Sequence, residues 1–124
     1  MKLPSAEFER CVREAIAEIP ESLRSYLDNV VVDIEAVPRA EDLAGLEIDD
    51  PAELLGLYHG TPLTERSVEA GFALPDRISI YQRNIEAACE SRQEIVEQIR
   101  TTVLHEIGHH FGMDEDDLFE VGYD

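Results

Sequence analysis

Residues 93–112 carry the most regular pattern in the chain, and this pattern constrains the fold more than any other feature. Apolar side chains recur here at helical spacing and share one face of a helix: Ile95, Val96, Ile99, Val103, Ile107 and Phe111. Ser91 and Glu94 have the spacing of a capping box before this run, and Gly112 is a typical helix stop. We therefore predict a long helix that packs its apolar face on a core.

Shorter helices and strands are predicted in the rest of the chain. Ser5 is expected to cap an N-terminal helix, whose apolar face runs from Phe8 to Ile19. Apolar runs over Val30–Val37, Leu54–His59 and Ile78–Tyr81 predict three strands. Further helical pieces are expected over 21–29, near 42–46, after Asn84 and, last, around Leu118, Phe119 and Val121.

Length and charge limit the classes of protein that fit. A chain of 124 residues, 44% of them hydrophobic, has the size of one domain, so we expect a single domain over 1–124. Ten basic against 28 acidic residues give a net charge of -18, which repels nucleic acids and anionic membranes. The expected partners are therefore peptides or proteins, including basic proteins, and neither nucleic acid nor membrane.

The two cysteines and the N-terminus indicate the compartment. Cys11 and Cys89 lie in segments that read as helical and lack the spacing of a metal-binding pair, so we predict buried reduced thiols. No run reaches the length of a membrane span, and residues 1–5 lack the pattern of a signal peptide. These features predict a cytoplasmic protein.

The long helix also carries the chain's strongest chemical motif. His105 and His109 are one turn apart on the side away from the apolar stripe, about 40° from each other around the helix axis. With Glu106 between them they form His-Glu-x-x-His, in which two neutral imidazoles bind Zn²⁺ and the glutamate takes a proton from water. His110 falls within the apolar stripe, so we predict that it is a core residue or supports the ligands rather than binding metal.

A catalytic zinc normally takes three protein ligands, and a carboxylate is the expected third one. The acidic run that follows Gly112 supplies candidates for this role: Asp114, Glu115, Asp116 and Asp117. The same run also fits the solvated first turn of a last helix. Tyr58 and His59, on a predicted strand, are candidates for donating a hydrogen bond to an oxyanion, and the alternatives are a packed ring for Tyr58 and a solvent-facing ring for His59.

Three segments carry a resemblance to a known family: His105 to Gly112, Gly-Thr-Pro-Leu-Thr-Glu-Arg at 60–66, and Pro-Asp-Arg-Ile at 75–78. Through them the chain resembles the bacterial zincin-like metallopeptidases called minimal metalloprotease-like proteins. The resemblance implies a small α+β domain in which the motif helix packs on a small sheet of about three strands, with N-terminal and C-terminal helices. It also implies the pattern HExxHxxGxx(H/D), with His105 and His109 as zinc ligands, Glu106 as general base and Gly112 as the turn before the third ligand. That third position is Glu115 here instead of Asp or His, so Asp114 and Asp116 stay open as substitutes.

A second similarity is to bacterial zinc-dependent endoribonucleases with a His-x3-His-x5-His pattern. The chain departs from that pattern at Glu115 and in its negative charge. We therefore expect a zinc peptidase with one Zn²⁺ per chain, although the same ligand set also suits Fe²⁺, Ni²⁺ or Co²⁺. The alternative is a metal-holding interaction domain whose acidic surface binds a basic partner.

Overall fold

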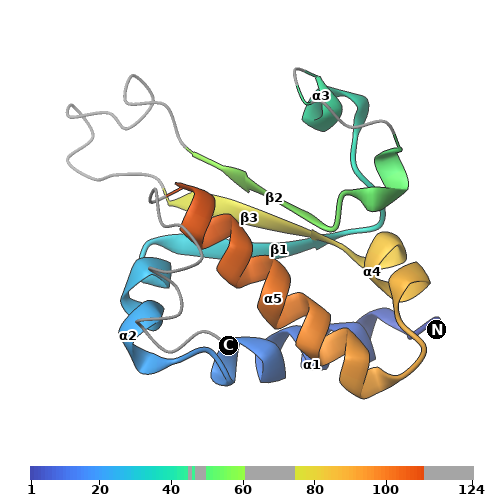
Figure 1. Cartoon of the computed structure of the whole chain (residues 1–124), viewed down its shortest axis with the longest axis horizontal. Coiled ribbons are helices and arrows are strands. Elements are labelled where there is room, and N and C mark those ends of the chain that lie inside the picture. Colours follow the sequence, from blue (N-terminus) through green and yellow to red (C-terminus); the bar gives the residue numbers. More distant parts are fainter. Residues whose placement is uncertain (45, 47–49, 61–74, 111–124) are drawn as a thin grey trace.

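The computed structural model of the chain describes residues 1–44, 46, 50–60 and 75–110. In chain order its elements are α1 (Ser5–Ala17), α2 (Glu21–Arg24), a 3-10 turn (Ser25–Leu27), β1 (Val30–Glu35), α3 (Ala40–Leu43), a 3-10 turn (Pro51–Glu53), β2 (Gly56–His59), β3 (Asp76–Tyr81), α4 (Gln82–Ala88) and α5 (Arg92–His110). They form a small α+β domain, as predicted, with α5 crossing the sheet (Figure 1). The predicted C-terminal helix lies outside the described residues.

The sheet has three strands in the order β1-β3-β2, so β3 is central among the described strands. β1 pairs with β3 in parallel, with Val30 opposite Asp76, whereas β2 pairs with β3 antiparallel, with Tyr58 opposite Ile78. β3 begins two residues before the predicted strand because this pairing includes Asp76. β1 and β2 are both shorter than predicted: β1 ends two residues before the end of its predicted run, and β2 begins two residues after the start of its own.

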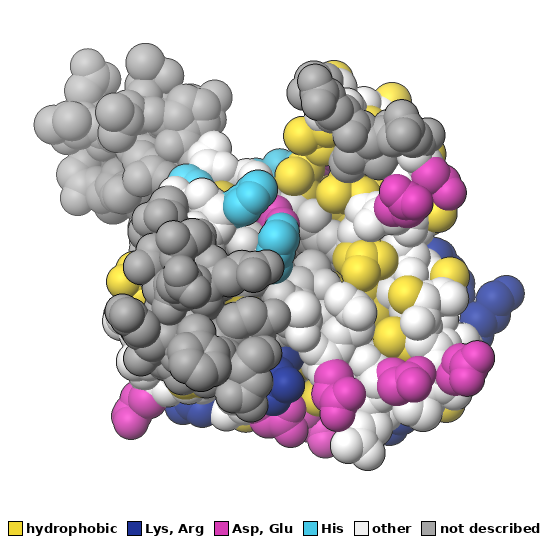
Figure 2. Space-filling model, viewed as in Figure 1, with side chains coloured by type: hydrophobic (Ala, Val, Ile, Leu, Met, Phe, Trp, Pro, Cys, Tyr) yellow, Lys and Arg dark blue, Asp and Glu magenta, His cyan; other side chains and the backbone are white. Residues whose placement is uncertain are grey.

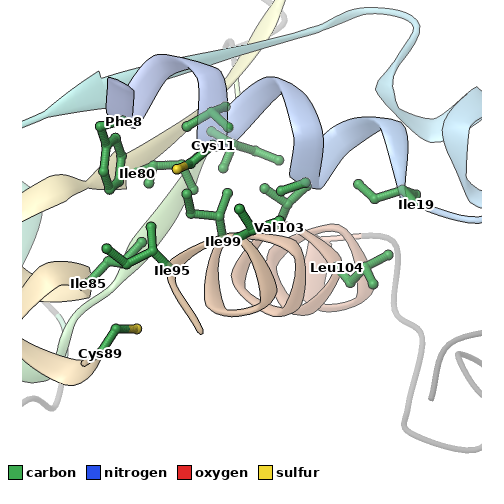
Figure 3. Close-up of a cluster of buried hydrophobic side chains, with 14 of the residues drawn as sticks. Phe8, Cys11, Ile19, Ile80, Ile85, Cys89, Ile95, Ile99, Val103 and Leu104 are labelled. Carbon is green, nitrogen blue, oxygen red and sulfur yellow. The ribbon is translucent and has the colours of Figure 1, made fainter. Parts of the chain in front are cut away.

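The core lies between one face of the sheet and two helices, α1 and α5 (Figure 3). Alternation along β3 points Ile78 and Ile80 toward these helices, and both side chains are fully buried. The predicted apolar stripe of α5 is confirmed for its described members, because Ile95, Val96, Ile99, Val103 and Ile107 are all buried. Phe111, the last predicted member, lies outside the described residues.

The starts of the two long helices differ from each other. The Ser91 hydroxyl accepts a hydrogen bond from the Glu94 N–H at 3.1 Å, as the predicted capping box requires, although the Glu94 carboxylate turns to the Glu90 N–H at 2.6 Å instead of to Ser91. The predicted Ser5 cap is wrong. Pro4 stands at the N-cap position, no side-chain cap is present there, and Ser5 is already within α1.

The two cysteines are buried and form no disulfide, as predicted. Cys11 lies in the core between α1 and α5, and Cys89 follows α4 (Figure 3). Burial raises the pKa of both thiols, which lowers the thiolate fraction and with it their reactivity. Within the described ranges, no helix has the length and apolar character needed to cross a membrane.

Candidate active site

The two histidines of the motif lie side by side on the last two turns of α5. The ring centroids of His105 and His109 are 5.0 Å apart with an interplanar angle of 30°, and both residues are exposed. Figure 2 shows histidine side chains gathered beside an acidic one at the edge of a hollow. One-turn spacing on an exposed helix face thus brings two imidazoles to where both can bind the same ion.

Glu106 turns toward the sheet instead of toward solvent. Its Oε1 accepts a hydrogen bond from the backbone N–H of Tyr58 at 3.1 Å. The Leu55 carbonyl accepts a hydrogen bond from the Tyr81 N–H, so the backbone groups of Leu55 face β3. In an antiparallel pair, residues whose backbone groups face the partner strand alternate with residues whose backbone groups face away from it. The Tyr58 N–H therefore points away from β3, from the side of β2 that pairs with no other described strand, and the Glu106 carboxylate accepts this hydrogen bond.

The environment of Glu106 changes its acidity. Burial raises the pKa of this carboxyl, whereas the hydrogen bond from the Tyr58 N–H and the nearby imidazoles of His105, His109 and His59 act in the opposite direction. Burial prevails, so the pKa lies above the ordinary value of a glutamate. A carboxylate with a raised pKa is a stronger base, which is the property that a group accepting a proton from water needs.

The Tyr58 side chain is held by two groups beside the motif helix. Its hydroxyl donates a hydrogen bond to Asp76 Oδ2 at 2.7 Å, and its ring stacks on His110 with centroids 3.8 Å apart and planes 10° from parallel. His110 Nε2 lies 3.8 Å from the same Asp76 oxygen. Tyr58 thus contacts Asp76 through its hydroxyl and Glu106 through its backbone N–H, and its role as an oxyanion donor stays a prediction.

His110 is not a core residue, contrary to the prediction. Its side chain is 38% exposed, and its ring stacks on the Tyr58 ring instead of packing in the core. The prediction that it plays a supporting part stays open, and its contact with Tyr58 is consistent with it.

His59 lies on the opposite side of β2 from Tyr58. Successive side chains of a strand point to opposite faces, and Tyr58 points to α5, so the His59 ring is on the face away from the motif helix. Its Nε2 is buried and has no hydrogen-bond partner among residues that the structure describes. The His59 imidazole is nevertheless close enough to Glu106 to act on the pKa of that carboxyl, which it lowers.

The candidates for a third metal ligand, Asp114, Glu115 and Asp116, lie outside the described residues. Among the described residues, no group of three His, Cys, Asp or Glu side chains is arranged to hold a metal ion. The neighbouring imidazoles of His105 and His109 nevertheless fit zinc, which in catalytic sites can bind three imidazoles or two imidazoles and a carboxylate.

Gly56 allows β2 to lie unusually close to α5. A Cβ atom at this position would be 2.6 Å from Cγ2 of Thr102 and 3.0 Å from the carbonyl oxygen of Ser79. A glycine inside an apolar strand is a recognised signal of such close approach, and the sequence interpretation did not use it. The Tyr58 N–H and the Asp76 carboxylate were also missed, and no local pattern marks either of them.

A hollow of about 330 Å³ lies beside Glu106, between β2 with the turn before it and α5. Its lining includes His105 and Glu106 at one side and reaches back along the helix to Gln98. The volume is at the lower end of the range of small-molecule and side-chain pockets. The candidate base therefore borders a cavity large enough for part of a substrate.

The sequence matches the family of zincin-like metallopeptidases over residues 27–123. The match covers most of the chain and includes β1, β2, β3 and the motif helix, so the chain belongs to this family. Among solved structures, it is similar to a conserved hypothetical protein from Thermo thermophilus, with 25% sequence identity and a TM-score of 0.53. That alignment covers 88% of this chain and 94% of the other. No curated protein matches the chain.

Proposed function

We propose that this chain is a zinc-dependent peptidase that hydrolyses peptide bonds with Glu106 as general base. The observation that carries the proposal is the position of Glu106, which lies between His105 and His109 in sequence and accepts a hydrogen bond from the edge strand at 3.1 Å. A half-buried carboxylate beside two exposed imidazoles is the arrangement that proton removal from water requires.

His105 and His109 would hold the metal, with Glu115 as the third ligand and Asp114 or Asp116 as alternatives. Zinc bound there would supply Lewis acidity, which lowers the pKa of water and polarises a carbonyl. Glu106 accepts the proton from the attacking water and later passes it to the leaving amine. The hydrogen bond from the Tyr58 N–H holds the Glu106 carboxylate in place during both transfers.

β2 is an edge strand among the described residues, and this edge offers a binding mode for the substrate. Gly56 follows Leu55, so its backbone N–H and carbonyl face outward. An extended peptide can pair with these groups of Gly56 as an added strand. Such a strand lies directly beside Glu106, which places a backbone amide next to the proposed base.

The first experiment measures zinc content and peptide hydrolysis for the parent protein and three variants. The parent and Glu106→Gln are expected to bind one zinc per chain, His105→Ala to lose it and Glu115→Ala to bind it more weakly. Glu106→Gln should reduce kcat/KM by about 10²- to 10⁴-fold. Glu97→Gln, on an exposed position of the same helix, is the control and should leave both properties unchanged.

Two outcomes contradict the proposal. If Glu106→Gln retains the hydrolytic activity of the parent, Glu106 is not the base. If the parent binds zinc, hydrolyses no peptide and gains many degrees of melting temperature from the metal, the zinc is structural. The second outcome would favour the alternative function, a metal-holding domain whose acidic surface binds a basic partner.

A further inference from the structure

The hollow beside Glu106 has a definite direction along α5. Gly56 approaches Thr102, and two residues later Tyr58 contacts Glu106, so β2 and α5 run the same way along the hollow. Glu53 precedes Gly56 and therefore lies toward the Gln98 end. Gln98 is two turns before Glu106, about 12 Å along the helix axis. The hollow thus leads from the proposed site of peptide cleavage toward Glu53.

The walls of this hollow suit a long side chain with a charged end. Leu54 and Leu55 are half-buried and give an apolar wall, while Gln98 and Thr101 are polar. Glu53, an exposed carboxylate at the far end, has no ion-pair partner within the described ranges. Lysine and arginine bury an apolar stem and keep the charged head in water. The apolar wall of Leu54 and Leu55 suits such a stem, and the exposed Glu53 carboxylate suits such a head.

The charges around the hollow favour a cation over an anion. Among the described residues that line it there is neither Lys nor Arg, whereas Glu53 and Glu106 are present. On the face seen in Figure 2, the basic side chains lie away from the hollow. The net charge of -18 adds a long-range attraction for basic peptides. An acidic side chain would meet repulsion from Glu53 at the end of the hollow.

We propose that this hollow binds a lysine or arginine side chain of the peptide substrate and that Glu53 selects its positive charge. This inference rests on the proposed peptidase function for its role in cleavage. It adds a substrate class, peptides with a basic residue at one fixed position from the cleaved bond, and a specificity-determining residue outside the His-Glu-x-x-His motif.

The test uses a synthetic library of blocked decapeptides, with cleavage sites identified by mass spectrometry. The zinc-loaded parent should cleave at a fixed position relative to Lys or Arg. Glu53→Lys should lower kcat/KM for these peptides about three- to tenfold, as expected for an exposed ion pair that becomes a repulsion. Cleavage of matched peptides with Glu at that position should rise. Glu97→Lys makes the same change in net charge outside the hollow and is expected to leave the preference unchanged.

A binding experiment without turnover separates this inference from the proposed function. Two fluorescein-labelled peptides are compared, one with Arg and one with norleucine at the position of the basic residue. Each is titrated into the Glu106→Gln protein and into the Glu53→Lys/Glu106→Gln double variant. The Arg peptide should bind more tightly to the first protein and lose this advantage in the second. Equal affinities in both proteins, or cleavage without a basic preference, would overturn the inference. If the parent cleaves no peptide, the peptidase proposal fails, and the binding titration still decides whether the hollow takes a cation.

Discussion

The two halves of α5 lie in contrasting environments. In the N-terminal half, Ile95 and Ile99 are fully buried against α1 and the sheet, and Arg92 forms ion pairs with Glu7 and Glu14 of α1. In the C-terminal half, Val103 and Ile107 continue the buried face, whereas the His105 and His109 side chains are exposed and the Glu106 carboxylate is drawn to a sheet edge.

The contrast shows how a small domain can hold reactive groups in fixed positions. A helix packed firmly along one face places the side chains of its other face without further support from loops. The energy that stabilises the fold and the chemistry that we propose for it therefore belong to different faces of one helix. Substitutions of buried core residues and of motif residues should consequently have separable effects on stability and activity.

The largest effect on stability is expected from Ile99→Ala, on the buried face of the N-terminal half of α5. The side chain is fully buried in the core, so its truncation leaves a cavity and should cost about 2–5 kcal/mol of unfolding free energy. Urea denaturation measures this change. Ile99→Val, which removes one methyl group, should cost about 0.5–1.5 kcal/mol and serves as the graded control. A loss below about 1 kcal/mol for Ile99→Ala would show that this half does not anchor the helix.

Gly56→Ala should lower both stability and activity, because Gly56 sets the distance between β2 and α5. The added Cβ would lie 2.6 Å from Thr102 Cγ2, so β2 must move, at a cost of about 1–3 kcal/mol. Peptidase activity should fall by more than this loss of stability explains, since the Tyr58 N–H moves away from Glu106. Calorimetry and steady-state kinetics measure the two effects.

Combining Gly56→Ala with Thr102→Ser removes the clashing methyl group and should restore part of both properties. The serine hydroxyl can keep the bond that Thr102 donates to the Gln98 carbonyl at 2.7 Å. Rescue should stay incomplete because the Ser79 carbonyl oxygen, 3.0 Å from the added Cβ, is part of the backbone. An unchanged activity in the single variant would mean that the spacing does not matter for the site.

Tyr58→Phe should reduce activity with a smaller effect on stability. The substitution removes the hydrogen bond to Asp76 and should cost about 1 kcal/mol, while the backbone N–H that holds Glu106 is retained. We expect kcat to fall several-fold and zinc affinity to stay the same. Tyr81→Phe is the matched control, because it removes a buried tyrosine hydroxyl that donates to Asp42, away from the site. Equal losses of activity in both variants would contradict a special role for Tyr58.

The smallest effect is expected at the ion pair between α1 and α5. Hydrogen bonds from Arg92 and Arg10 lower the pKa of Glu7, so its charged form is favoured in the folded protein. The stabilisation is therefore present above the unfolded-state pKa and is lost as the pH falls through the lower folded-state pKa, in the range below about pH 4. Glu7→Gln should flatten the acid limb of a stability profile and leave activity at neutral pH unchanged. A steeper acid limb in the variant would contradict the sign of this effect.

Local patterns predict much of this molecule. The spacing of Ile95, Ile99 and Val103 predicts α5 and its buried face, and the one-turn spacing of His105 and His109 predicts that they share an exposed face. Both are properties of a single helix, so the 3.6-residue repeat contains the information.

Contacts between distant segments could not be predicted in this way. Glu106 and Tyr58 are 48 residues apart, and their contact depends on which strand lies at the edge and which of its N–H groups face outward. Strand order and direction depend on pairings that leave no periodic signal in one sequence. The error at His110 has a related cause, because a helical wheel gives a direction around the axis and does not show where the core ends.

The hydrogen bond from the Tyr58 N–H to Glu106 also has an evolutionary consequence. An unpaired edge strand invites pairing with another molecule and so promotes aggregation, and here a carboxylate occupies one of the edge donors. A descendant that lost catalysis would still benefit from an acceptor at this position. Inactive relatives should therefore keep Gln, or another side chain with an oxygen acceptor, where this chain has Glu106, and aliphatic replacements should be rare there.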